Sequence, residues 1–169
     1  MKRVAVFILL GLALFCPALA RDLPACPVAV YFSPHGGCTE AVVAEIDRAA
    51  QVIHVQAYSF TSRPIADALI RAHQRGIDVR VILDKGQRGD KGQGAFVAAA
   101  GVTVLFDPVH AIAHNKVMVI DGHRVITGSF NFTSAAEKSN AENLVVMDSV
   151  EAAAFYLENW TTHEEHSVP

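Results

Sequence analysis

Residues 114–131, which read HNKVMVIDGHRVITGSFN, predict two β-strands joined by a tight turn. Apolar residues dominate 116–120 and 124–127, where we expect the two strands. The pair Asp121-Gly122 between them is typical of a tight hairpin turn, because both residue types tolerate positive φ angles. This segment therefore predicts two antiparallel neighbours in one sheet.

The polar residues of this hairpin are placed to surround a small anion. Side chains two positions apart on a strand point to the same face, so His114 projects together with Lys116, and Ser129 with Asn131. Paired strands can thus hold an imidazole, an ammonium, a hydroxyl and an amide around one phosphate. The lysine supplies charge, the hydroxyl and amide supply donors, and histidine can attack phosphorus or protonate a leaving oxygen.

The rest of the chain alternates strands and helices before this hairpin. We expect strands at 28–32, 52–58, 77–83, 102–106 and 143–147, helices at about 39–50, 64–75 and 150–162, and a short helix ending at Gly101. Alternating units followed by a hairpin predict an α/β fold with a mixed, mostly parallel β-sheet sandwiched by helices. No linker divides residues 21–169, which we expect to form a single domain.

The chain has 169 residues, of which 51% are hydrophobic and 18% charged, a composition that excludes a disordered protein. Residues 1–20 have the three parts of a secretory signal peptide, namely Lys2-Arg3, an uncharged apolar run and the small-residue pattern Ala18-Leu19-Ala20. We expect cleavage and export to the periplasm or the medium, while retention as an anchor stays open. No transmembrane segment is expected in the mature chain.

Removal of residues 1–20 leaves 12 basic and 17 acidic residues, a net charge of −5. This acidic balance argues against general electrostatic affinity for nucleic acid, so any phosphate site must be local. Cys26 and Cys38 then remain in a chain expected in an oxidising compartment, and we expect a disulfide between them. Two unbonded thiols are the alternative.

The pattern His-x-Lys-x4-Asp-x6-Gly-Ser-x-Asn over residues 114–131 resembles the signature of the phospholipase D superfamily. A short exported chain with one copy of the pattern is similar to the small single-motif bacterial endonucleases of that superfamily, and the order of elements upstream resembles theirs. The resemblance implies a phospholipase D-like catalytic domain with one motif per chain, no cofactor, and a homodimer whose two motifs meet at a shared site.

The resemblance also implies a role for each polar residue. His114 of one subunit attacks phosphorus to form a phosphohistidine, and His114 of the partner subunit protonates the leaving oxygen before water completes hydrolysis. A positive charge on both of two neighbouring imidazoles is energetically unfavourable, so we expect one neutral and one protonated ring. Lys116 and Asn131 bind the non-bridging oxygens, with Ser129 as a further donor. Glu142 resembles the acidic residue that orients the nucleophile, and a purely structural carboxylate is the alternative.

Other parts of the pattern have supporting roles. Asp121 is expected to fix the hairpin turn, and Gly128 completes the motif. Lys85, Arg88 and Lys91 lie among glycines after a strand, where α/β sheets commonly bind ligands, and we expect them to line a phosphodiester groove or to form a solvated loop.

We expect no metal site in this chain. Asp107, His110 and His114 do not share a helical face, because the segment contains a proline and ends in a strand. His163 and His166 lack metalloprotease spacing, and we expect them in a fraying, solvated tail.

Three functions compete at this stage. The first is a secreted or periplasmic nuclease with little sequence preference, since backbone phosphate carries the recognition, and the sequence does not decide DNA against RNA. The second is hydrolysis of phospholipid head groups as a phospholipase D. The third is a catalytically inactive phosphate-binding protein. The single motif and the small size favour the nuclease, and the presence of both His114 and Lys116 disfavours the inactive protein.

Overall fold

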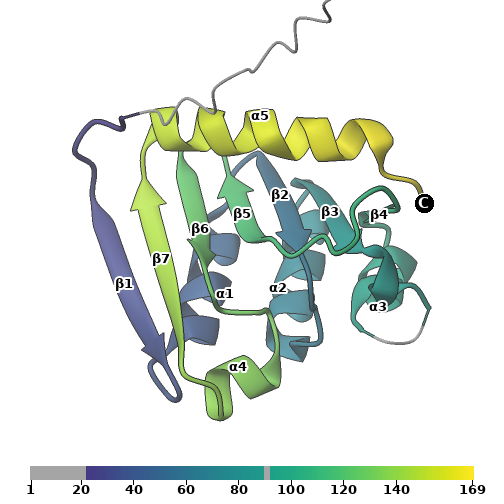
Figure 1. The fold of residues 1–169 in the computed structure, drawn as a ribbon, viewed down its shortest axis with the longest axis horizontal. Coiled ribbons are helices and arrows are strands. Elements are labelled where there is room, and N and C mark those ends of the chain that lie inside the picture. The colour runs from purple at the N-terminus through teal and green to yellow at the C-terminus, as the bar shows by residue number, and fades with distance from the viewer. Residues whose placement is uncertain (1–21, 90–91) are drawn as a thin grey trace, which may run out of the picture.

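The computed structural model describes residues 22–89 and 92–169, which form a seven-stranded sheet covered by helices (Figure 1). The elements in chain order are β1 (Val28–Ser33), α1 (Cys38–Arg48), β2 (Val52–Ala57), α2 (Arg63–Gln74), β3 (Asp78–Asp84), the 3-10 turn η1 (Lys85–Gln87), α3 (Gly94–Ala99), β4 (Thr103–Asp107), β5 (Lys116–Ile120), β6 (Arg124–Gly128), α4 (Ser134–Lys138), β7 (Glu142–Asp148) and α5 (Val150–His166). The strands lie in the order β1-β7-β6-β5-β2-β3-β4. The predicted hairpin, β5 and β6, therefore lies inside the sheet.

The α/β class and the mixed sheet are confirmed, but the pairing differs from the mostly parallel arrangement expected. Four of the six strand pairs are antiparallel, namely β1–β7, β7–β6, β6–β5 and β5–β2. The pairs β2–β3 and β3–β4 are parallel. The helices α2 and α3 each return the chain to a strand beside the preceding one, which gives one parallel pair each time. The connection through α1 instead carries the chain from the edge strand β1 to the distant β2, so these two strands do not pair, and the strands that lie between them pair antiparallel.

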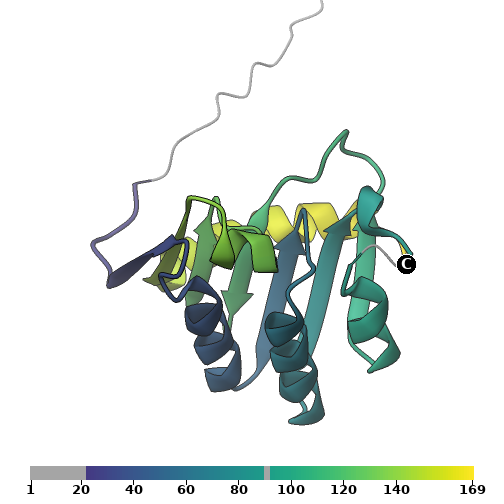
Figure 2. The same ribbon diagram turned by 90° about the horizontal axis from the view of Figure 1, so that it is seen from below.

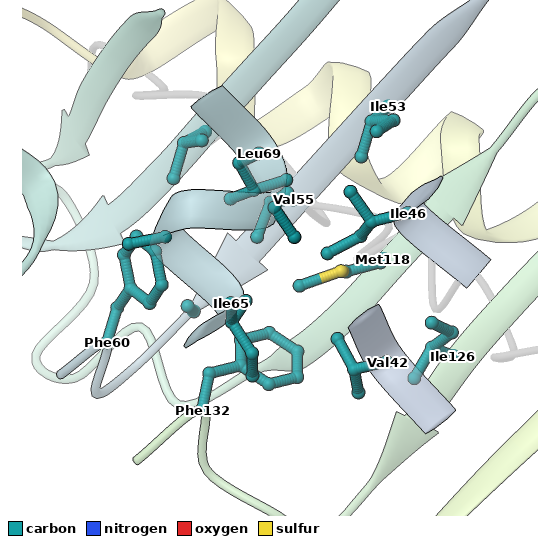
Figure 3. Close-up of a cluster of buried hydrophobic side chains, with 14 of the residues drawn as sticks. Val42, Ile46, Ile53, Val55, Phe60, Ile65, Leu69, Met118, Ile126 and Phe132 are labelled. Carbon is teal, nitrogen blue, oxygen red and sulfur yellow. The ribbon is translucent and has the colours of Figure 1, made fainter. Parts of the chain in front are cut away.

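Helices cover the two faces of the sheet unequally. Figure 2 shows α1, α2 and α3 on one side and α5 on the other. The larger core lies between α1, α2 and the sheet, where Ile46 and Leu69 pack with Val55 and Met118 (Figure 3). A smaller cluster lies under α5. All five residues of β5 are buried, so this strand, which begins at Lys116, is packed on both of its faces.

The turn of the hairpin is tied to the neighbouring strand β2. Asp121 and Gly122 both have positive φ angles, 52° and 68°, as a tight Asp-Gly turn requires. The carboxylate of Asp121 accepts backbone N–H groups from Ala50 at 2.8 Å, Gln51 at 2.8 Å and Val52 at 3.0 Å. Burial alone raises the pKa of this carboxyl, but these three donors outweigh it and hold the pKa below its usual value. Asp121 therefore fixes where the hairpin sits against β2.

Cys26 and Cys38 are unbonded, which corrects the expected disulfide. The six-residue strand β1 lies between them and spans about 20 Å, whereas the Cα atoms of a disulfide lie within about 7 Å. Cys38 is buried at the start of α1, and burial is the main reason that its pKa rises to about 11. The two cysteines therefore behave as separate thiols.

Two expectations fall on residues outside the described part of the chain. These are the signal peptide at residues 1–20 and the side chain of Lys91. Within residues 22–89 and 92–169, no helix has the length and apolar character needed to cross a bilayer.

Candidate active site

Strand register brings the ends of the motif to one edge of the sheet. Met118 pairs with Ile126 across the antiparallel β5–β6 ladder, so the start of β5 lies beside the end of β6. On the other side of β6, Gly128 pairs with Leu144, which places the start of β7 at this same edge. Residues far apart in the sequence are thus collected around the point where β5 begins.

A cavity of about 520 Å³ opens at this edge. Its lining comes from the ends of these strands and from α5, and it consists of His114, Asn115, Lys116, Val117, Thr127, Gly128, Ser129, Asn131, Glu142 and Tyr156. All the predicted catalytic residues are in this set. Most of the residues that line the cavity have polar side chains, which suits a charged ligand.

His114 and Lys116 are in direct contact inside this cavity. The ammonium of Lys116 lies 2.9 Å and 3.2 Å from the two ring nitrogens of His114 and donates to its carbonyl oxygen at 2.6 Å. His114 is exposed, whereas Lys116 is buried. Because an ammonium can only donate, the ring nitrogen facing it acts as an acceptor. An unprotonated nitrogen of this kind is the form that can attack phosphorus.

The environment of Lys116 reduces its affinity for a proton. Burial lowers the pKa of this ammonium from its usual value, and the Glu142 carboxylate acts in the opposite direction. An ammonium with few water contacts is a strong partner for a phosphoryl oxygen, because no large hydration shell has to be removed first.

Ser129 is bound to Glu142 rather than left free. Its hydroxyl donates to Oε2 of Glu142 at 2.6 Å and accepts the backbone N–H of Asn143 at 3.1 Å. The other oxygen of Glu142 accepts the side-chain amide of Asn140 at 3.1 Å. These contacts place Glu142 in the cavity but on the serine side, so its predicted role in orienting His114 stays a prediction.

The structure indicates what two further residues of the motif, Asn131 and Gly128, contribute to the site. The Oδ1 atom of Asn131 is buried and has no hydrogen-bond partner within the described residues, which leaves a polar group at the cavity available to a ligand. Gly128 has a φ of 140°, and a Cβ atom there would lie 2.3 Å from the carbonyl oxygen of Asn143. Only glycine allows β6 and β7 to come this close.

The basic segment after β3 lies outside the cavity. The ammonium of Lys85 donates to the carbonyl oxygen of His110 at 2.7 Å, and the guanidinium of Arg88 lies 4.8 Å from the centre of the Phe106 ring. Neither residue lines the 520 Å³ cavity. Lys85 therefore supports the loop that precedes His114, and a groove role for either cation stays a prediction.

Sequence reasoning missed three residues that shape this site. The Tyr58 ring lies 4.5 Å from the His114 ring and 5.1 Å from the ammonium of Lys116, so it limits where both groups can move. Tyr156 of α5 lines the cavity. Asp84 accepts the backbone N–H of Ala113 at 2.8 Å and so fixes the residue before His114. Their partners are distant in sequence, so no local pattern indicates these contacts.

Comparisons with known proteins identify the family of this chain. Residues 42–162 match the family described as "Cardiolipin synthase, PLD-like domain". A protein named phospholipase D from Rickettsia felis is 45% identical over 134 residues, which are 79% of this chain and 67% of that protein. The structure of Nuc from Salmonella typhimurium, a phospholipase D family member, has 37% identity and a TM-score of 0.80, and the match covers 85% of this chain and 97% of that one. NucT from Helicobacter pylori shares the fold, with a TM-score of 0.78 at 22% identity over 85% of this chain and 99% of that one.

The fold and these comparisons together define a class of phosphodiesterase. The chain belongs to the phospholipase D superfamily. Four polar residues of the predicted motif line the cavity, namely His114, Lys116, Ser129 and Asn131.

Proposed function

We propose that this phosphodiesterase is a metal-independent, non-specific endonuclease. The observation that carries the proposal is the contact between the exposed imidazole of His114 and the buried ammonium of Lys116 in an open, polar cavity. Such a site binds the phosphate that every nucleotide shares and reads no base edge, so it accepts many sequences.

The chemistry needs two imidazoles. A neutral His114 nitrogen forms a bond to phosphorus while the bond from phosphorus to the leaving oxygen breaks, and a protonated imidazole gives that oxygen its proton. Water then attacks the phosphohistidine, returns a proton to the second imidazole and frees His114. Lys116 and Asn131 contact the non-bridging oxygens, where negative charge grows in the transition state.

A homodimer supplies the second imidazole. Among the described residues that line the cavity, His114 is the one imidazole, so a single chain lacks the acid that the reaction requires. A two-fold axis beside the cavity brings in His114 of the partner subunit by an isologous contact. Activity per chain is then expected to fall on dilution below the dimer dissociation constant.

We also propose that the enzyme acts outside the cytoplasm. The support is the signal-like composition of residues 1–20. Fractionation of cells that express the full chain is expected to place the shortened protein in the periplasm or the medium, and a full-length protein held in the cytoplasm would contradict export.

Plasmid cleavage in excess EDTA tests the nuclease. The wild-type protein is expected to nick and linearise supercoiled DNA, and His114→Asn, purified in parallel, is expected to leave it intact. Equal cutting by both proteins would identify a contaminant. A folded dimeric wild type that cuts neither DNA nor RNA would contradict the proposal.

A second candidate, phospholipid hydrolysis, has its own support. The loop before His114 exposes Val109 and Ile112, whose exposed fractions are 64% and 57%. Apolar side chains beside a phosphodiester site suit contact with lipid. Release of head groups from phosphatidylglycerol or phosphatidylcholine vesicles, measured for the wild type and for Val109→Ser with Ile112→Ser, decides this point. The lipid enzyme is expected to lose activity on vesicles in the double variant, whereas the nuclease keeps its activity on DNA.

A further inference from the structure

Three imidazoles and one carboxylate converge at a place separate from the phosphodiester cavity. Asp107 is the last residue of β4, His110 lies in the loop that follows, and His163 and His166 lie in the last turn of α5. One ligand atom from each of the four residues lies within 4.8 Å of the other three. The expected solvated tail is therefore wrong, because α5 continues through His166 and His163 is buried.

The fold brings these residues together by two independent constraints. His163 and His166 are three positions apart on α5 and so project from neighbouring positions on one side of the helix. Just beyond them, Val168 and Phe106 exchange backbone hydrogen bonds of 2.8 Å and 3.0 Å, which hold the end of the chain against β4. Figure 1 shows this end of α5 beside β4. The cluster is thus part of the ordered sheet edge.

Hydrogen bonds from the backbone hold the carboxylate of Asp107 in an orientation suited to a metal ligand. Its Oδ1 atom accepts the backbone N–H groups of Val109 at 3.0 Å and His110 at 3.2 Å. Its Oδ2 atom faces ring nitrogens of His110 at 2.8 Å, His163 at 2.8 Å and His166 at 3.3 Å. One oxygen therefore faces three imidazoles, while the other is engaged by backbone.

Hydrogen bonds within the cluster do not satisfy all of its members. Nε2 of His166 is buried, and its contact with Oδ2 of Asp107 at 3.3 Å lacks the geometry of a hydrogen bond. A buried polar nitrogen without a well-formed hydrogen bond is costly, and an ion is one of the groups that accounts for such an atom. A cation bound by all four residues uses the lone pair of each ring and the charge of the carboxylate together.

We propose that Asp107, His110, His163 and His166 bind a zinc ion. Three imidazole nitrogens and one carboxylate oxygen are ligands that zinc takes in tetrahedral sites, whereas magnesium and calcium prefer oxygen alone. Zinc–ligand bonds of about 2.0–2.1 Å place ligand atoms about 3.3 Å apart, so small side-chain movements suffice. His110 is 46% exposed and gives the ion a path from solvent.

The ion has a structural role in this arrangement. Four protein ligands close a tetrahedral site, and closed sites are the structural kind. The ion connects the end of α5 with the loop that leads from β4 to His114, and Lys85 holds the carbonyl of His110 from the other side. Zinc binding is therefore expected to raise the melting temperature of the protein by about 5–10 °C at a hundredfold excess of free zinc over the dissociation constant.

Zinc stoichiometry and affinity test the site without recourse to enzyme activity. The full chain without a histidine tag is stripped with chelator, titrated with zinc chloride against a chromophoric chelator, and analysed for bound metal by mass spectrometry. One zinc per chain is expected. His110→Gln and His163→Gln are expected to weaken binding at least 100-fold, whereas His73→Gln and His114→Asn keep wild-type affinity.

Each outcome of this experiment decides the proposal. A wild type that binds no stoichiometric zinc overturns it, as does unchanged affinity in His110→Gln or loss of zinc from His114→Asn. His110 is on the surface, so its variant remains informative if His163→Gln fails to fold, and melting of the stripped proteins checks this. X-ray absorption at the zinc edge is expected to show three imidazoles and one oxygen near 2.0–2.1 Å.

Discussion

Replacing Asp121 by asparagine separates a structural role of this motif residue from a catalytic one. Asparagine adopts the left-handed backbone of the turn as readily as aspartate, so the substitution leaves the turn itself unstrained. Oδ1 can still accept from Gln51 and Val52, but the new amide group opposes the Ala50 N–H that Oδ2 now accepts. A hydrogen bond to a charged group contributes about 1.5–3 kcal/mol, and water reaches this partly exposed turn. We therefore expect a loss of about 1–3 kcal/mol in the free energy of unfolding at pH 7.

Urea unfolding at several pH values measures this loss and its origin. The pKa of Asp121 is depressed in the folded protein, so its stabilisation is present above the unfolded value near 3.9 and disappears as pH falls through the folded value. The difference between wild type and Asp121→Asn is thus expected to shrink below about pH 4.

Two comparisons complete this test. Asp67→Asn, which removes a surface ion pair with Arg63, is expected to cost about 0.5 kcal/mol or less. Activity per folded molecule is expected to stay at the wild-type level, because β5 separates Asp121 from Lys116 by about 17 Å. Wild-type stability in Asp121→Asn, or lost turnover in a fully folded variant, would refute the reasoning.

Three further substitutions or treatments have clear expected outcomes. Lys116→Met is expected to keep the fold and lower kcat by at least about 100-fold, because it removes the charge that faces the phosphate, and steady-state kinetics with a circular-dichroism control measure this. Gly128→Ala is expected to destabilise the protein by at least about 2 kcal/mol, since its Cβ atom meets the Asn143 carbonyl at 2.3 Å, and a melting temperature within 1 °C of wild type would disprove that estimate. Cys26 is expected to react with a thiol reagent at pH 8 in the native protein while Cys38, whose pKa is raised to about 11, reacts only after unfolding. Native protein with no titratable thiol would restore the disulfide.

The sequence alone predicts the elements of this fold better than their arrangement. Periodicity and turn residues place nearly every strand and helix within a few positions, because local backbone preferences decide them. The strand that pairs with β1 depends instead on long-range packing. No local pattern indicates whether the chain after Ser33 forms its next strand beside β1 or crosses to a distant part of the sheet. The disulfide prediction failed for a more local reason, because it was based on an even number of cysteines and an oxidising compartment and did not consider that the six-residue strand β1 separates Cys26 from Cys38.

The same distinction between local pattern and long-range packing applies to the residues of the candidate site. The motif residues lie on two adjacent strands or within three positions of their ends, so their spacing is sufficient to predict that they meet. Tyr58 and Asp84 come from other strands and could be found only from the folded chain. The four residues around Asp107 are the strongest case, because 53 positions separate His110 from His163, and their convergence depends on how α5 lies across the sheet.

The antiparallel hairpin also predicts that the motif tolerates no insertion or deletion. The hairpin begins at Lys116 and ends at Gly128, and it consists of two five-residue strands and a three-residue turn. The length of the hairpin therefore sets the number of residues between Lys116 and Gly128. Insertion or deletion of one residue in either strand reverses which face every later side chain of that strand occupies. Ser129 and Asn131 would then point away from His114, although all the catalytic residue types were still present. Variation in length among related chains is therefore expected in the surface loops, and the segment from Lys116 to Gly128 is expected to keep its length wherever the enzyme is active.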